Sequence, residues 1–85
     1  MRKERQELKQ IMDENNIKSY SLEVNKEYIE IRYMSYNFYD EDTFNKIFQS
    51  GLFLEKLKKV YNNVEELELD NECFTATYLI HRQQN

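Results

Sequence analysis

The chain has 85 residues, of which 40% are hydrophobic and 33% charged, and it carries a formal net charge of −4. A chain of this length forms a single domain (residues 1–85), because a second hydrophobic core would have too few residues to enclose. It contains one cysteine, one glycine and no proline, which excludes an intramolecular disulfide framework and the glycine-rich loops that bind nucleotide phosphates.

The first predicted unit is a helix followed by a β-hairpin. Apolar residues recur at helical spacing within residues 2–15, which end in Asn15-Asn16, a pair typical of a helix stop. Apolar and polar residues then alternate in residues 19–24 and 28–34, with a short polar break between them. Such alternation predicts two half-buried antiparallel strands joined by a tight turn.

A connector and a second helical stretch follow. Residues 35–41 are rich in Tyr and Phe, and they lead into an amphipathic stretch at 43–62. Asp40 or Asp42 is the predicted N-cap, because a carboxylate there accepts hydrogen bonds from the first free amides of a helix. Gly51 costs about 1 kcal/mol in a helix interior, so we expect a kink or two short helices meeting at this glycine.

Alternation returns in the last third of the chain and predicts a second hairpin. Its strands lie near residues 64–70 and 74–80, with Asn71-Glu72 as the turn. Leu67 and Leu69 are assigned to the side of the sheet that faces the core. From both halves, the expected core includes Leu22, Ile31, Phe48, Leu57, Leu69 and Phe74.

The order helix-strand-strand therefore occurs twice. It predicts an α+β fold of two layers, a four-stranded antiparallel sheet with the helices on one face. Two arrangements stay open, a circularly permuted ferredoxin-like order and two hairpins paired across a pseudo-twofold. The shared spacing of Asn15-Asn16-Ile17 and Asn62-Asn63-Val64 indicates an internal duplication or the general pattern of a helix-to-hairpin junction.

Residue types that support catalysis are scarce. His81 and Cys73 are the only residues of their kinds, and on one straight strand they lie about 26 Å apart at roughly 3.3 Å per residue. A Cys–His nucleophilic pair needs hydrogen-bond contact, and one His with one Cys does not complete a structural zinc site. We therefore predict no catalytic residues, no metal, no cofactor and no enzymatic activity.

The pattern of acidic residues predicts a binding surface. If the apolar residues face the helices, the other sheet face is acidic, and Arg32 is its one countercharge. Such a face can imitate the phosphates of nucleic acid and dock into a basic groove, or it is simply the solvated face of an antiparallel sheet. The carboxylates assigned to it are Glu23, Glu30, Glu66, Glu68 and Asp70.

The connector is the second predicted binding element. Its rings and the acids after them are Tyr36, Phe38, Tyr39, Asp40, Glu41 and Asp42. Tyrosine is enriched at binding hot spots, so the connector either caps the core or presents its rings to a partner. Stacking on single-stranded nucleic acid normally needs a positive groove, which only the basic stretch at 43–62 could supply.

These features favour a small protein-binding module, an inhibitor or regulator that binds stoichiometrically to a basic, nucleic-acid-handling protein. In general character the chain resembles the small inhibitors that phages and mobile elements direct at host nucleases and transcription factors, although no motif assigns it to a family. The alternatives are a nucleic-acid-binding α+β module that uses residues 43–62 and a homo-oligomeric subunit, such as a homodimer. Direct nucleic-acid binding is disfavoured, because affinity for phosphates comes from Lys and Arg.

Sequence features also predict the location of the protein. No apolar run approaches the length of a membrane span, and no apolar segment follows the charged N-terminus as in a secretory signal. We therefore expect a cytoplasmic protein without membrane contact.

Overall fold

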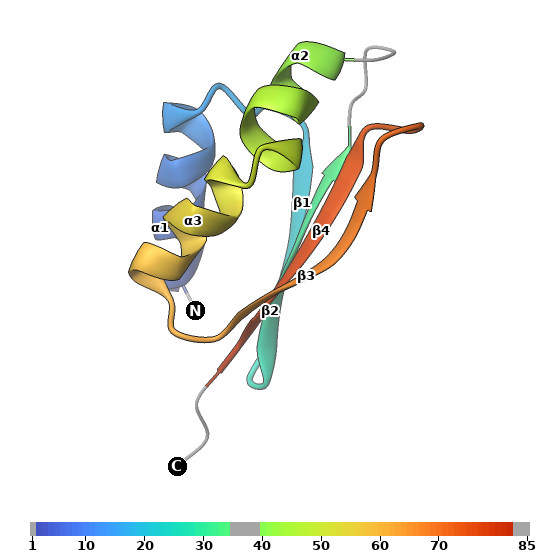
Figure 1. Ribbon diagram of the computed structural model, residues 1–85. Coiled ribbons are helices and arrows are strands. Elements are labelled where there is room, and N and C mark those ends of the chain that lie inside the picture. Colours follow the sequence, from blue (N-terminus) through green and yellow to red (C-terminus); the bar gives the residue numbers. More distant parts are fainter. Residues whose placement is uncertain (1, 35–39, 83–85) are drawn as a thin grey trace.

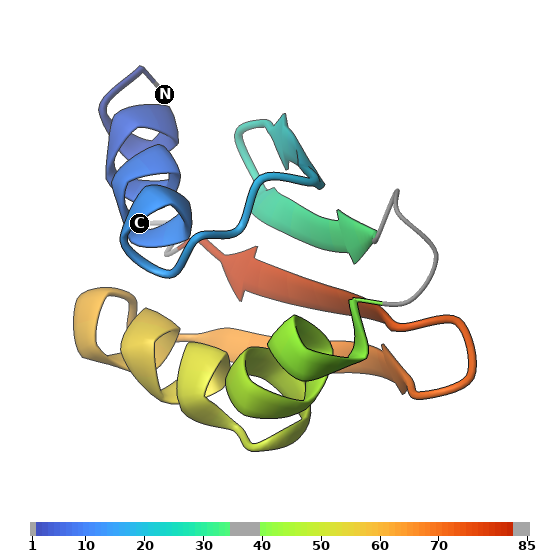
Figure 2. The same ribbon diagram turned by 90° about the horizontal axis from the view of Figure 1, so that it is seen from above.

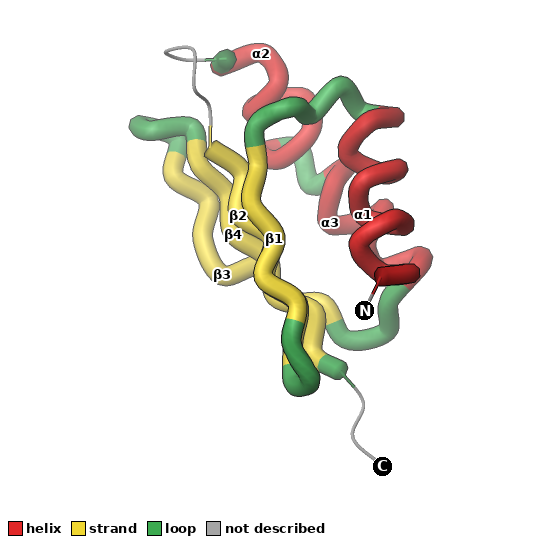
Figure 3. The backbone as a smooth tube through the Cα atoms, turned by 180° about the vertical axis from the view of Figure 1, so that it is seen from behind, coloured by secondary structure: helices red, strands yellow, loops and turns green. Residues whose placement is uncertain are grey.

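The computed structural model describes residues 2–34 and 40–82, and its strands form one four-stranded antiparallel sheet (Figure 1). Figure 3 shows the helices together on one side of this sheet. The predicted α+β class and the α-β-β-α-β-β order are confirmed. The elements are α1 (Arg2–Glu14), β1 (Tyr20–Val24), β2 (Tyr28–Met34), α2 (Glu41–Thr43), the π-helical η1 (Phe44–Gln49), α3 (Leu52–Val60), β3 (Val64–Asp70) and β4 (Thr75–His81).

The strand order is β1-β2-β4-β3, so the two hairpins join through their second strands (Figure 2). This is also the order of a ferredoxin-like sheet whose first strand has moved to the end of the chain, so both predicted arrangements describe it. The bounds of β2 and β4 differ by 47 residues at each end (28 to 75 and 34 to 81). Their register is symmetric about the pair Ile31–Tyr78, as a pseudo-twofold axis there requires.

Short side chains close both hairpins in the same way. Asn25 Oδ1 accepts hydrogen bonds from the amides two and three residues ahead, and Asp70 Oδ1 does the same in the second hairpin. The second turn is longer than predicted, because Asp70 and Thr75 are the last paired residues and four residues lie between them. Phe74 ends this loop in the left-handed conformation, at φ 57°.

The helical stretch between the hairpins breaks at Gly51, as predicted. Gly51 has a φ of 86°, a value that L side chains rarely adopt, and it separates η1 from α3. The π-helical character of η1 was not predicted. It is visible in the hydrogen bond from the amide of Ser50 to the carbonyl oxygen of Asn45, five residues back. The wide π turn brings residues four apart into line, and both Phe44 and Phe48 are fully buried.

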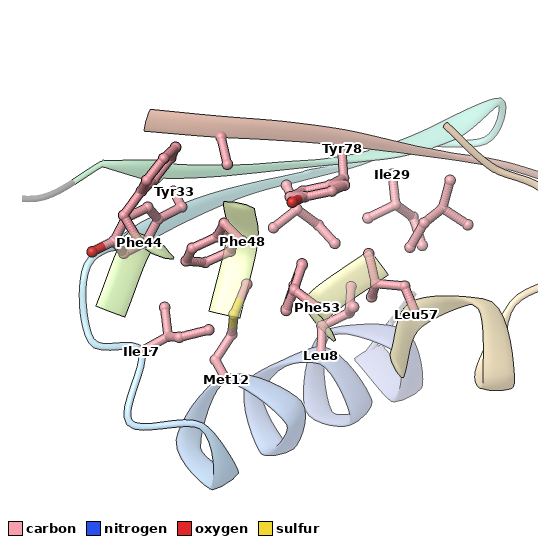
Figure 4. Packing of buried hydrophobic residues seen from close by; sticks show 13 residues of the cluster. Leu8, Met12, Ile17, Ile29, Tyr33, Phe44, Phe48, Phe53, Leu57 and Tyr78 are labelled. Atoms are coloured by element: carbon pink, nitrogen blue, oxygen red, sulfur yellow. The ribbon is translucent and has the colours of Figure 1, made fainter. Parts of the chain in front are cut away.

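The core lies between the sheet and the helices (Figure 4). Phe48 is central to it: its ring stacks on Tyr33 with centroids 4.3 Å apart and lies 5.1 Å from the ring of Phe53. Of the six residues expected in the core, three are fully buried, Ile31, Phe48 and Leu57. The other three are only partly buried and pack against the cluster, namely Leu22, Leu69 and Phe74.

A β-bulge in β3 overturns part of the predicted alternation. The register with β4 shifts between Glu66 and Glu68, which leaves Leu67 as the extra residue. Glu66 pairs with Tyr78, whose side chain is buried against the helices. Because paired residues share a face, Glu66 lies on the helix-facing side and its assignment to the acidic face was wrong. Leu67, which the alternation assigned to the core-facing side of the sheet, is 46% exposed.

The hydroxyl of Tyr78 allows a test of the core. It is buried and has no hydrogen-bond partner within the part of the chain that the structure describes. Burial, with a smaller contribution from the charge of Glu66, raises the pKa of Tyr78 above its ordinary value. We expect Tyr78→Phe to raise the free energy of unfolding by about 1 kcal/mol at neutral pH, because an unsatisfied buried hydroxyl is removed.

The difference in the free energy of unfolding between Tyr78→Phe and the wild type should increase as pH rises. Above about pH 10 the Tyr78 phenol ionises in the unfolded state while it stays protonated in the folded state, so the wild type loses stability that the Phe variant keeps. Urea unfolding at neutral pH and at about pH 11 measures both effects, and Tyr20→Phe, at a half-buried position, is the control. A clear loss of stability in Tyr78→Phe would contradict the unsatisfied hydroxyl.

Candidate functional site

The side of the sheet opposite the helices is called here the open face, and no described element covers it (Figure 3). Cross-strand pairing decides which residues lie on it, because directly paired residues point to the same side. β2 contributes Glu30, Arg32 and Met34 to this face. Their partners on β4, and the residues of β3 paired with those partners, lie on the same face. Five carboxylates lie on the open face, and together they form the acidic face: Glu23, Glu30, Glu65, Glu68 and Asp70.

Two of these acids stand directly opposite each other. Glu23 on β1 pairs with Glu30 on β2, and like charges in such positions destabilise a sheet. Glu23 accepts a 2.6 Å hydrogen bond from the hydroxyl of Tyr28, and this bond raises the pKa of Tyr28. Arg32 Nη2 lies 3.4 Å from Glu30 Oε1, but this one guanidinium does not balance the carboxylates around it.

A shallow groove crosses the open face between β2 and β3. Its volume is about 500 Å³, and its lining includes the acids Glu30 and Glu68 together with Arg32. Two apolar side chains also line it, Met34 at 38% and Leu67 at 46% exposure. The bulge in β3 is what turns Leu67 toward this groove, so the irregularity gives an acidic surface an apolar component.

No family model, curated protein or solved structure compared with the chain matches it. We therefore infer a function from the surface of the chain.

The predicted site residues do not all lie together. Glu30, Glu68 and Asp70 share the open face, and Glu66 does not. Asp70 also has a structural role, because the amides of Cys73 and Glu72 donate to its carboxylate and lower its pKa. Glu65 was missed, and it lies on the open face beside His81, with Oε1 3.0 Å from the ring Nε2.

The acids at the start of α2 belong to the helix layer rather than to the open face. Asp40 caps α2: its Oδ1 and Oδ2 accept from the amide and the hydroxyl of Thr43, which lowers the pKa of Asp40. Glu41 and Asp42 form the first turn, where carboxylates favour helix formation. Three further predicted residues, Tyr36, Phe38 and Tyr39, lie outside the described residues.

A second hollow, of about 290 Å³, lies where α1, α3 and the end of β4 meet. Arg82 Nη1 donates a 2.6 Å bond to Glu4 Oε2, and this pairing lowers the pKa of Glu4. The Nε and Nη2 atoms of Arg82 are buried and lack an acceptor among residues 2–34 and 40–82. Because these atoms have no accessible surface, we interpret Arg82 as a structural residue that connects the helix layer to the sheet.

Few of the residues that the structure describes are suited to catalysis or metal binding. Cys73 is exposed in the second hairpin turn, where the charge of Asp70 raises its pKa and disfavours the reactive thiolate. Within 2–34 and 40–82, no group of three or more His, Cys, Asp or Glu side chains is placed to hold a metal ion. The described helices are also too short or too polar to cross a bilayer.

Proposed function

We propose that the chain is a small protein-binding module whose open face docks onto a protein with a basic surface and regulates it by stoichiometric binding. The observation that carries this proposal is the composition of that face. It combines an excess of carboxylates over Arg32 with a groove lined by exposed Met34 and Leu67.

Charge supports a basic partner. Glu23 and Glu30 repel each other across β1 and β2, and a Lys or Arg side chain of a partner would relieve this repulsion. An acidic surface also accelerates encounter with a basic one, an effect that salt weakens. The same charge repels phosphate, so the acidic face favours a protein over a nucleic acid as its partner.

The groove supports docking rather than simple solvation. Charge alone steers encounters, whereas slow dissociation needs apolar groups that become buried in the interface. Met34 and Leu67 supply such groups from β2 and β3, on either side of β4. A partner that inserts an apolar side chain between them and places cations beside Glu30 and Glu68 would use the whole groove.

A comparative capture experiment tests the proposal. Immobilised wild type, the face variant Glu30→Lys/Glu68→Lys and the control Glu14→Lys/Glu55→Lys are exposed to the same cell extract. The control makes the same change in net charge with exposed residues of α1 and α3. We expect basic proteins that the wild type and the control retain equally and the face variant loses.

Equal retention by all three baits would contradict the proposal, and so would wild-type captures dominated by acidic proteins. Quantitative mass spectrometry measures retention, and circular dichroism checks that each bait is folded. Glu30 is only partly exposed, so a Glu68→Lys single variant serves if the double variant unfolds.

The nucleic-acid alternative depends on the lysines of α3. Lys58 and Lys59 lie in its last turn, where cations stabilise the carboxyl end of a helix, so helix stability alone explains them. We expect no measurable binding of labelled single- or double-stranded oligonucleotides at physiological salt, as read by fluorescence anisotropy. Micromolar binding that is lost on replacing Lys56, Lys58 and Lys59 would establish the alternative instead.

A further inference from the structure

The two edges of the sheet differ in how their backbones are protected. β3 is interrupted by the bulge between Glu66 and Glu68 and is rich in acidic side chains. Bulges and charges of this kind keep an edge strand from pairing with another chain. β1 has no bulge, because its register with β2 is unbroken from Tyr20 to Val24. Figures 2 and 3 show no described element beyond β1.

The hydrogen bonds of the first hairpin show which backbone groups of β1 point outward. The amide of Met34 donates to the carbonyl oxygen of Ser19, and the amide of Asn25 donates to that of Tyr28. These bonds mark the residue pairs that are hydrogen-bonded, and such pairs alternate with non-bonded pairs along an antiparallel ladder. The N–H and C=O groups that point away from β2 are therefore those of Tyr20, Leu22 and Val24.

We propose that two copies of the chain pair through β1, antiparallel to each other, about a twofold axis at Leu22. In this register Tyr20 of one copy is opposite Val24 of the other, and Leu22 is opposite its own copy. Each outward N–H then meets an outward C=O, so the unpaired groups of the edge become paired. The two sheets join into one.

The side chains of β1 fit the same register. Tyr20, Leu22 and Val24 are half-buried at the rim of the core and point to the helix side, so pairing places the apolar rims of the two copies next to each other. On the open face, Ser21 is opposite Glu23 of the second copy. The single acidic residue of β1 therefore avoids its own copy. This self-complementarity is why we choose a second copy, rather than an unrelated strand, as the occupant.

Sedimentation velocity on the wild type, from about 1 µM to about 1 mM, tests the proposal. We expect a species of twice the 10.5 kDa chain mass to grow with concentration. Ser21→Glu places a carboxylate opposite Glu23 at two symmetric positions and should weaken the dimer about tenfold. The double variant Ser21→Glu/Glu23→Arg restores an attractive pair and should return the affinity to within about threefold of the wild type. Glu66→Arg, on the other edge, should leave it unchanged.

Hydrogen exchange tests the dimer on the wild type alone, without any substitution. The amide of Leu22 should exchange rapidly in dilute solution and become protected as the dimer forms. A wild type that stays monomeric over the whole range would overturn the proposal. So would a dimer that Ser21→Glu does not weaken, one that the double variant does not restore, or an exchange rate at Leu22 that is independent of concentration.

Discussion

Replacing Phe48 by Ala is expected to lower the free energy of unfolding by about 3–5 kcal/mol. The ring is fully buried, stacks on Tyr33 and also contacts Phe53, so truncation leaves a cavity that faces both the sheet and the helices. Domains are stable by only about 5–15 kcal/mol, and one this small lies near the lower end of that range. The variant should therefore be largely unfolded a few degrees above room temperature.

Urea or thermal unfolding measures this loss. Leu52→Ala is the matched control, because Leu52 follows Gly51 in the same helical stretch but is 37% exposed, and it should cost less than about 1 kcal/mol. A loss below about 1 kcal/mol for Phe48→Ala would show that η1 does not pack on the sheet as described.

The second large effect concerns the kinetics of partner binding. With a basic protein obtained by capture, Glu30→Lys/Glu68→Lys should lower the association rate constant at least about tenfold at low salt, with a smaller difference at high salt. Met34→Ala and Leu67→Ala should instead raise the dissociation rate constant, because they remove apolar groups that the interface buries. Both side chains are well exposed, so these truncations should leave the fold intact.

Surface plasmon resonance at two salt concentrations separates the two effects. Glu14→Lys/Glu55→Lys is again the matched control for net charge. If Glu14→Lys/Glu55→Lys lowers the association rate constant as much as Glu30→Lys/Glu68→Lys does, the rate depends on net charge alone. That result would contradict docking through the acidic face.

Much of the fold could be predicted from the sequence, because it follows from periodicity. The helical spacing of α1 and the alternation in β2 and β4 are regular, and the break at Gly51 follows from its conformational freedom. The π-helical turns of η1 could not be predicted, because Phe44 and Phe48 are spaced as they would be in an α-helix. The difference lies in the backbone hydrogen bonds, which leave no mark in the pattern of apolar residues.

The candidate site could be predicted only in part, because its position depends on one irregular strand. Glu30 and Glu68 were placed correctly by the alternation of regular segments. Leu67 and Glu66 were not, although the chain holds a signal: Val64 and Leu67 are three residues apart, while Leu67 and Leu69 are two apart. These three apolar residues cannot share one face of a regular strand, so a bulge was implied. The structure shows that Leu67 is the residue it displaces.

Backbone amide mapping of the ¹⁵N-labelled chain bound to a captured basic protein shows directly whether the partner docks on the open face. We expect shift changes and protection from exchange to concentrate on the open face, at Glu30, Met34, Leu67, Glu68 and Thr77, while the amides of α3 stay unchanged. Perturbations centred on α3 around Lys56, Lys58 and Lys59, with the open face unaffected, would contradict docking on the open face.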